Sequence, residues 1–275
     1  MPHHLHFWGV RGSMPVGGAE TARYGGHTPC ITVDGGGRSH IVLDAGTGIH
    51  RFQKTLADPG PDGWDFHVLF THFHLDHIIG LPFFKPLFDA RNRFTFYGYP
   101  YDGRPVDEVV HGILAPPWFP VALADVPASQ TFIELTGEPL SIAGIDIQPD
   151  QLEHPQGVAA FRLMGPERSV VLATDYERGV STHLDARLDR LASGVDVLIH
   201  DAQYTPEEYV AEHKGWGHST WEMAVESATA AGAKELILMS HDPDRSDEEV
   251  DALVEAARQS GFPIRAAYEG LSLDI

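Results

Sequence analysis

Short apolar runs, separated by turns that contain glycine or proline, recur along the whole chain. Runs of this kind, rich in Val, Ile and Phe, are typical of buried β-strands. They predict strands over residues 5–10, 31–33, 40–43, 66–70, 94–97, 132–135, 142–147, 158–163, 169–173, 196–199, 234–239, 264–267 and 271–273. Because a glycine-rich stretch lies between the second and third runs, we expect these two strands to pair as a hairpin.

Capping residues mark where helices begin. Thr205, Ser219 and Ser246 are each followed three positions later by a glutamate, which is the capping-box pattern of a helix start. Gly232 is expected to end the helix that follows Ser219. A short helix is also predicted over residues 49–56.

Residues 102–120 are expected to be irregular. They end in an aromatic and proline-rich run that contains Trp118 and Phe119. A loop of this length is often a lid or the wall of a pocket, and it is equally suited to a subunit interface. The sequence leaves both interpretations open.

Composition sets outer limits on the function. Nineteen basic and 39 acidic side chains give a formal net charge of −20, which repels the phosphate backbone of a large nucleic acid. A small anionic substrate is still compatible, because bound dications would reverse the local potential. The single cysteine, Cys30, excludes an intramolecular disulfide and favours a reducing compartment. With no signal peptide or membrane-spanning run visible, we expect a cytoplasmic protein.

The segment 71–77, Thr-His-Phe-His-Leu-Asp-His, concentrates metal-ligand chemistry at a predicted strand end. Imidazole nitrogens and carboxylate oxygens are ligands that zinc, iron and manganese accept. His72 and His74 alternate, so on an extended backbone they point the same way. Asp76 and His77 follow the strand and can face a second point. The spacing therefore favours one metal at the first pair and another at the second pair.

This segment resembles the HxHxDH signature of the metallo-β-lactamase-fold superfamily. Three further motifs, GVRGS (9–13), YGGHT (24–28) and LDAGTG (43–48), resemble the ribonuclease Z and phosphodiesterase-like branch of that superfamily. The resemblance covers nearly the whole chain. It implies an α+β fold, the four-layer αββα sandwich, built as a single domain over residues 1–275, with the site along one edge of the two sheets.

The same resemblance implies a dinuclear ligand set of seven side chains. One metal would take His72, His74 and His154, and the other would take Asp76, His77 and His241. Asp175, in an ATD context, would bridge the two. Zinc suits these N and O donors, and manganese or iron would fit as well. Two metals bound in this way can share a hydroxide, which serves as the nucleophile. Asp76, as a ligand of one of these metals, would then belong to the catalytic group.

Phosphodiester cleavage also needs a proton for the leaving alkoxide. The motifs HDAQ (200–203) and GHST (217–220) resemble the HEAT-type and GHST-type motifs of ribonuclease Z, with aspartate in place of glutamate. In that branch the acidic residue pairs with the histidine. The resemblance therefore implies that His218 donates the proton and that Asp201 orients it.

The sequence favours a small phosphodiester, such as a cyclic nucleotide, as the substrate. Ribonuclease Z enzymes insert a long arm between the ligand histidine and the bridging aspartate, whereas only 21 positions separate His154 from Asp175. The alternatives are a lactone or ester hydrolase on the same metals, an iron-dependent oxidoreductase and a non-catalytic metal-binding protein. A homodimer is also compatible with the sequence.

Overall fold

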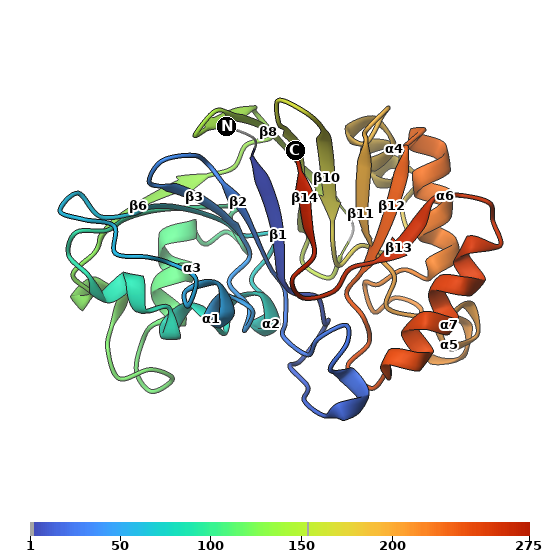
Figure 1. Ribbon diagram of the computed structural model, residues 1–275, viewed down its shortest axis with the longest axis horizontal. Coiled ribbons are helices and arrows are strands. Elements are labelled where there is room, and N and C mark those ends of the chain that lie inside the picture. Colours follow the sequence, from blue (N-terminus) through green and yellow to red (C-terminus); the bar gives the residue numbers. More distant parts are fainter. Residues whose placement is uncertain (1–2, 153) are drawn as a thin grey trace.

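Two seven-stranded sheets form the centre of the molecule (Figure 1). The structure is a computed structural model that describes residues 3–152 and 154–275. In spatial order, the first sheet contains β14 (Ser272–Asp274), β1 (His4–Gly9), β2 (Cys30–Asp34), β3 (Ser39–Leu43), β4 (Asp65–Leu69), β5 (Arg93–Gly98) and β6 (Ser129–Glu134). The strands from β3 to β6 run parallel.

The second sheet is formed by the C-terminal half of the chain. Its strands, in spatial order, are β13 (Ile264–Ala266), β12 (Glu235–Met239), β11 (Val197–Asp201), β10 (Ser169–Ala173), β9 (Val158–Met164), β8 (Ile145–Leu152) and β7 (Leu140–Ile142). The strands from β10 to β13 are parallel. The carboxyl ends of these parallel strands face the lower edge of the molecule in Figure 1.

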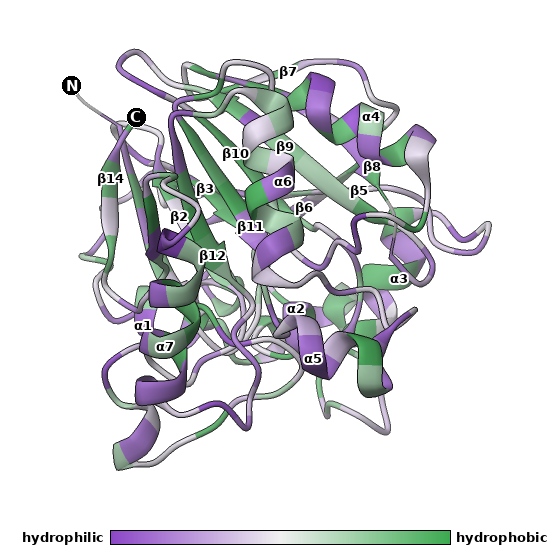
Figure 2. Cartoon of the chain, turned by 90° about the vertical axis from the view of Figure 1, so that its right-hand side faces the viewer, coloured by the Kyte–Doolittle hydropathy of each residue, from purple (hydrophilic) through white to green (hydrophobic). Residues whose placement is uncertain are grey.

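Helices cover the outer faces of both sheets (Figures 1 and 2). The α-helices are α1 (Ile49–Phe52), α2 (Leu75–Ile78), α3 (Val106–Ile113), α4 (Thr182–Leu191), α5 (Pro206–Glu208), α6 (Trp221–Ala231) and α7 (Asp247–Arg258). Short 3-10 segments lie at Ala19–Thr21, Leu81–Phe83, Lys85–Phe88 and Leu123–Asp125, and a π-helical turn at Tyr209–His213 continues α5. Within the described residues, no helix is long and apolar enough to cross a membrane.

Three hydrophobic clusters show that the layers are stacked as α, β, β, α. One cluster lies between the sheets, one under α1 to α3 and one under α4, α6 and α7. Alternate residues of a strand face different clusters: Ile199 of β11 points between the sheets, whereas Leu198 points to the helices. This alternation follows from the period-two geometry of a strand, and it confirms the predicted αββα sandwich.

The strand predictions are confirmed with one exception. Residues 142–147 were expected to be one strand, but they contain the turn between β7 and β8. Ala143 and Gly144 both adopt positive φ, at 52° and 85°, as a two-residue hairpin turn requires. Alanine rarely adopts this conformation, so the pattern gave little indication of the turn.

The helix predictions need three corrections. Residues 102–120 are not irregular throughout, because α3 forms there and buries Val106 and Val110, one helical turn apart. Helix α4 was not predicted at all. Thr220, not Ser219, caps α6 by accepting the Met223 N–H. The capping boxes at Thr205 and Ser246 and the left-handed Gly232 at the end of α6 are confirmed.

Candidate metal centre

Three histidines from two distant segments of the chain gather at the lower edge of the sheets. His72 follows β4, His74 begins α2, and His154 follows β8. Their ligand atoms lie within 4.8 Å of one another. The Nδ1 atom of His74 lies 3.1 Å from Nε2 of His154, and the ring centroid of His72 is within 4.8 Å of both other rings. The structure therefore brings together the three side chains predicted for one metal.

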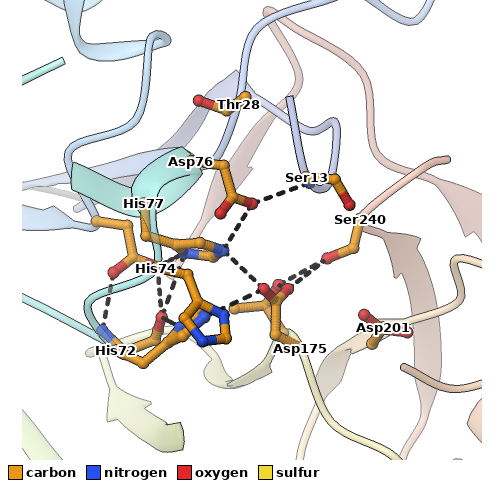
Figure 3. Close-up of polar contacts among 12 residues, drawn as sticks. Ser13, Thr28, His72, His74, Asp76, His77, Asp175, Asp201 and Ser240 are labelled. Carbon is orange, nitrogen blue, oxygen red and sulfur yellow. Dashed lines mark hydrogen bonds and ion pairs between the residues drawn. The ribbon is translucent and has the colours of Figure 1, made fainter. Parts of the chain in front are cut away.

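A second group surrounds the carboxylate of Asp175 (Figure 3). His77 Nε2 lies 2.7 Å from Asp175 Oδ2 and 3.3 Å from Asp76 Oδ2. The same Asp175 oxygen is 3.5 Å from His72 Nε2. Asp76 is held in place by the backbone N–H of Ser13, at 2.9 Å. Because Asp175 faces His72 on one side and His77 on the other, it occupies the position expected of a bridging ligand.

Each clustered histidine is held through the ring nitrogen that faces away from the cluster. His154 Nδ1 is 2.8 Å from the carbonyl of Gly217, His77 Nδ1 is 2.8 Å from Asp44 Oδ2, and His74 Nε2 is 3.2 Å from Gln156 Oε1. An acceptor at the outer nitrogen fixes the proton there, so the inner nitrogen keeps its lone pair. This is the arrangement that orients histidines as metal ligands.

Asp44 supports two of these positions at once. Besides holding His77, its carboxylate accepts the backbone N–H and the hydroxyl of Thr71, at 2.8 and 2.7 Å. Thr71 in turn lies 3.1 Å from Nδ1 of His72. The Asp44 backbone adopts a left-handed conformation, with φ of 60°. Asp44 therefore lies directly behind the cluster and supports it.

Asp76 lies beside His77 but outside the clustered ligand groups, and His241 also joins none of these groups within the described residues. His241 is buried after β12, and its Nε2 donates to the carbonyl of Ala267 at 2.9 Å. This hydrogen bond leaves the lone pair on Nδ1. The loop that carries His241 reaches the first half of the chain through a bridge to Arg11. The role of His241 as a metal ligand stays a prediction.

Burial and mutual charge shift the pKa values of these groups strongly. Burial lowers the pKa of His72 well below its usual value and that of His154 to about 4. Burial also opposes the charged form of His77, but the surrounding carboxylates of Asp175, Asp76 and Asp44 raise its pKa. The carboxylates thus give the site a negative field, and burial keeps His72 and His154 neutral, and both properties favour a cation.

Asp201 and His218 form a buried pair beside these groups. His218 Nδ1 lies 2.7 Å from Asp201 Oδ2, and Asp201 Oδ1 accepts the backbone N–H of Ser219 at 2.8 Å. Ligand atoms of both residues lie within 4.8 Å of one from Asp175. Burial opposes the charge on His218, but the Asp201 carboxylate raises the pKa of the imidazole to about 9. Asp201 therefore reaches His218, although its side chain is shorter than the glutamate of the HEAT-type motif.

A family model described as the beta-lactamase superfamily domain matches residues 39–241 of this chain, which contain every ligand candidate. The chain belongs to the beta-lactamase superfamily. Its two sheets and outer helices are the metallo-β-lactamase fold, as the motifs implied.

The chain is similar to an uncharacterized protein, to a ribonuclease Z and, in fold, to a solved diphosphatase. An uncharacterized protein of Mycobacterium leprae is 26% identical over 86% of this chain and 78% of its own length. Ribonuclease Z of Lachnospira eligens is 28% identical over 62% of this chain and 53% of its own length. A solved diphosphatase of the PhnP family shares the fold with a TM-score of 0.70, at 21% identity and with 99% and 98% of the two chains covered.

Glu177 is a site residue that the sequence did not reveal. It is buried two positions after Asp175, and its carboxylate accepts the backbone N–H groups of Gly215 and Gly217, both at 2.7 Å, and the hydroxyl of Tyr209 at 2.8 Å. Gly217 precedes His218. Glu177 therefore fixes the loop that positions His218 and the carbonyl that holds His154. The only sequence feature that could have indicated Glu177 is its position, two residues after the aspartate of the ATD motif.

The donor set fits a divalent cation. His72 Nε2 is buried and has no hydrogen-bond partner within the described chain, although it faces the other donors. An unpaired buried imidazole nitrogen is costly unless something binds it. The clustered residues offer imidazole nitrogens and carboxylate oxygens, a set typical of superfamily metal sites and compatible with zinc, manganese or iron.

Proposed function

We propose that this protein is a metal-dependent hydrolase that cleaves a small phosphodiester, with two divalent cations at the described cluster. The observation that carries the proposal is the buried Asp201–His218 pair beside Asp175. An acyl hydrolase expels its leaving group from a tetrahedral intermediate and depends less on a positioned imidazolium. A diester with a poor alkoxide leaving group does need one.

The assignment of ligands follows the resemblance, and the geometry supports it for the five residues that the structure groups together, His72, His74, His77, His154 and Asp175. His72, His74 and His154 would hold one cation, and Asp76, His77 and His241 would hold the other, with Asp175 between them. Zinc is the first choice for these donors, and manganese or iron is compatible with them. Two such cations would supply a hydroxide nucleophile at neutral pH and neutralise the phosphoryl oxygens.

The protein itself contributes a proton donor, His218, and a residue that orients it, Asp201. Asp201 accepts the Nδ1–H of His218, which aims Nε2 of the ring as the proton donor and stabilises the imidazolium. Transfer of that proton to the leaving oxygen avoids release of a free alkoxide. The backbone N–H of Ser219 holds the second oxygen of Asp201, so the carboxylate is fixed at both oxygens.

The fold is compatible with a small substrate. The residues between His154 and Asp175 are taken up by β9 and β10, which form a tight antiparallel pair and leave no arm for tRNA. The net charge of −20 disfavours a large polyanion. The relatives named as a ribonuclease and a diphosphatase support phosphoester chemistry.

The experiment is hydrolysis of bis(p-nitrophenyl) phosphate by protein of known metal content. We expect turnover in the wild type with about two metals per chain. Asp175→Ala should lose both metal and activity, whereas His218→Ala should keep the metal and lose only part of the activity, because p-nitrophenolate is weakly basic and leaves readily without a proton. His183→Ala, an exposed histidine on α4, is the matched control and should change neither.

Two outcomes would reject the proposal. Fully metallated wild type that hydrolyses p-nitrophenyl acetate or a lactone but no phosphodiester in a small panel would indicate an acyl hydrolase. His218→Ala with unchanged turnover of diphenyl phosphate, whose more basic phenolate needs the proton, would remove the proposed proton donor.

A further inference from the structure

An apolar cavity of about 470 Å³ lies beside the metal cluster. Its walls come from α2 and the segment after it, from α3 and from the loop after α3. In Figure 1, α2 lies at the lower edge of the first sheet, where β4 delivers the ligand histidines. A cavity of this size is in the range of sites for small ligands.

The cavity adjoins the metal-binding segment. Phe73 and Leu75, which both line it, alternate in sequence with His72, His74 and Asp76. Neighbouring Cα atoms are about 3.8 Å apart. The cavity is therefore near enough to hold one part of a molecule whose other part is held by the metal ligands.

The lining is mostly apolar and aromatic. Arg104 and Glu108, which carry opposite charges, are the charged side chains in it. Phe83 and Phe119 meet edge to face, with ring centroids 5.7 Å apart. Aromatic walls of this kind bind a flat ring by stacking and edge contacts, and they give no net charge to attract an ionic group.

Several of these apolar side chains are unusually exposed. Trp118 is 82% exposed, Leu75 67% and Phe83 61%. An exposed apolar patch next to polar catalytic groups is typical of a ligand site. The exposed side chains converge on the same cavity, so one occupant would cover all three.

We propose that this cavity binds an uncharged aromatic group that is esterified to the scissile phosphate. The inference rests on the proposed phosphodiesterase function and defines its substrate class, a diester with one aromatic substituent. The aromatic ring lies in the cavity, while the phosphate lies at the metal cluster and the other ester oxygen faces His218.

A larger side chain at Gly112 would fill the cavity. It lies within α3, it lines the cavity, and a Cβ atom built on it would meet no other atom within 4 Å. Leucine and alanine both favour helices more than glycine does. Gly112→Leu should therefore occupy the cavity without disturbing the fold, and Gly112→Ala is the matched small control.

The test compares the binding of 1-naphthyl phosphate and methyl phosphate to metal-loaded protein by calorimetry. We expect the wild type to bind the naphthyl ester at least about tenfold more tightly. Gly112→Leu should abolish that preference, with methyl phosphate affinity and melting temperature unchanged, and Gly112→Ala should keep it. The measurement needs no turnover, so it is independent of whether bis(p-nitrophenyl) phosphate is hydrolysed.

Equal affinities in the wild type, or a preference that survives in Gly112→Leu, would overturn the proposal. A Gly112→Leu variant that changes from dimer to monomer in light scattering, with its ligand preference intact, would instead identify this face as a subunit contact.

Discussion

At the scale of single residues, the site depends on atoms that hold the ligands from behind. The carbonyl of Gly217, the carboxylate of Asp44 and the amide of Gln156 each fix the outer nitrogen of one histidine. Glu177 fixes Gly217 itself. Without these contacts the imidazoles would rotate, and the inner lone pairs would lose their common focus.

Glu177→Gln tests this supporting network. The amide nitrogen of glutamine would face a backbone N–H or the Tyr209 hydroxyl in place of a carboxylate oxygen, so at least one donor would be left unpaired. We expect phosphodiesterase kcat and zinc affinity to fall about 10–100-fold, with about 1–3 kcal/mol lost from the free energy of unfolding. Exposed Glu207→Gln is the control. A loss of stability with unchanged zinc affinity would make Glu177 merely structural.

The candidate ligands could be predicted from sequence, whereas the supporting residues Glu177 and Gln156 could not. His72, His74, Asp76 and His77 lie within six positions, so their pattern is local. His154 and Asp175 were found because strand ends and motifs mark them. Glu177 and Gln156 act across long sequence separations, partly on backbone atoms, and no local pattern encodes such contacts.

At the scale of elements, the ends of three strands aim the functional side chains. Asp44 after β3, Asp175 after β10 and Ser240 after β12 all adopt left-handed φ values between 52° and 60°. Such residues are rare outside glycine and concentrate at functional sites. Each one turns the chain sharply as it leaves the sheet. In Figure 3, Asp175 and Ser240 face each other across this edge, and their side chains lie 3.1 Å apart.

The opposite ends of the same parallel strands are joined by Asp196. Its carboxylate accepts the N–H of Ser169, at the start of β10, and the ammonium of Lys234, before β12. The Lys234 ammonium and the Ser169 hydrogen bonds hold the pKa of Asp196 well below its usual value. The folded state therefore binds fewer protons than the unfolded state, so this contribution is present above pH of about 4 and declines as the pH falls.

Asp196→Asn should reveal that pH dependence. In urea unfolding of the chelator-treated protein, we expect the variant to be less stable by about 0.5 kcal/mol at neutral pH, because the pair is largely solvent-exposed. The difference should shrink steadily as the pH is lowered from about 5. A difference that stays constant with pH would show that the charge on Asp196 contributes nothing.

Element prediction succeeded where the residue pattern was strong and failed where it was mixed. The strand runs and the two confirmed capping boxes combine apolar content with characteristic end residues. Helix α3 contains three valines and a glycine between proline-rich segments, all of which reduce helix propensity. It forms because packing of Val106 and Val110 outweighs that local preference.

At the scale of the whole molecule, the metal cluster lies where the two halves of the chain meet. His72, His74, Asp76 and His77 follow a strand of the first sheet, whereas His154 and Asp175 follow strands of the second. Bound cations would therefore join the two sheets as well as supply chemistry.

Metal removal should consequently lower the stability of the entire fold. Chelation leaves the buried carboxylates of Asp44, Asp76 and Asp175 without a neutralising cation, and each site filled at 1,000 times its Kd adds about 4 kcal/mol. We expect a clear fall in the melting temperature by scanning calorimetry, reversed by added zinc. An unchanged melting temperature after complete chelation would show that the cluster holds no metal in solution.

The most direct test of the proposed chemistry is the dependence of kcat/KM on the leaving group in aryl phosphodiesters. His218 is proposed to protonate that group, so its removal should matter most for the most basic phenolate. We predict that His218→Ala, with full metal content, loses about 100-fold or more on phenyl esters and much less on p-nitrophenyl esters. An equal loss across the series, or none, would contradict the role of His218 and Asp201 as the proton-donating pair.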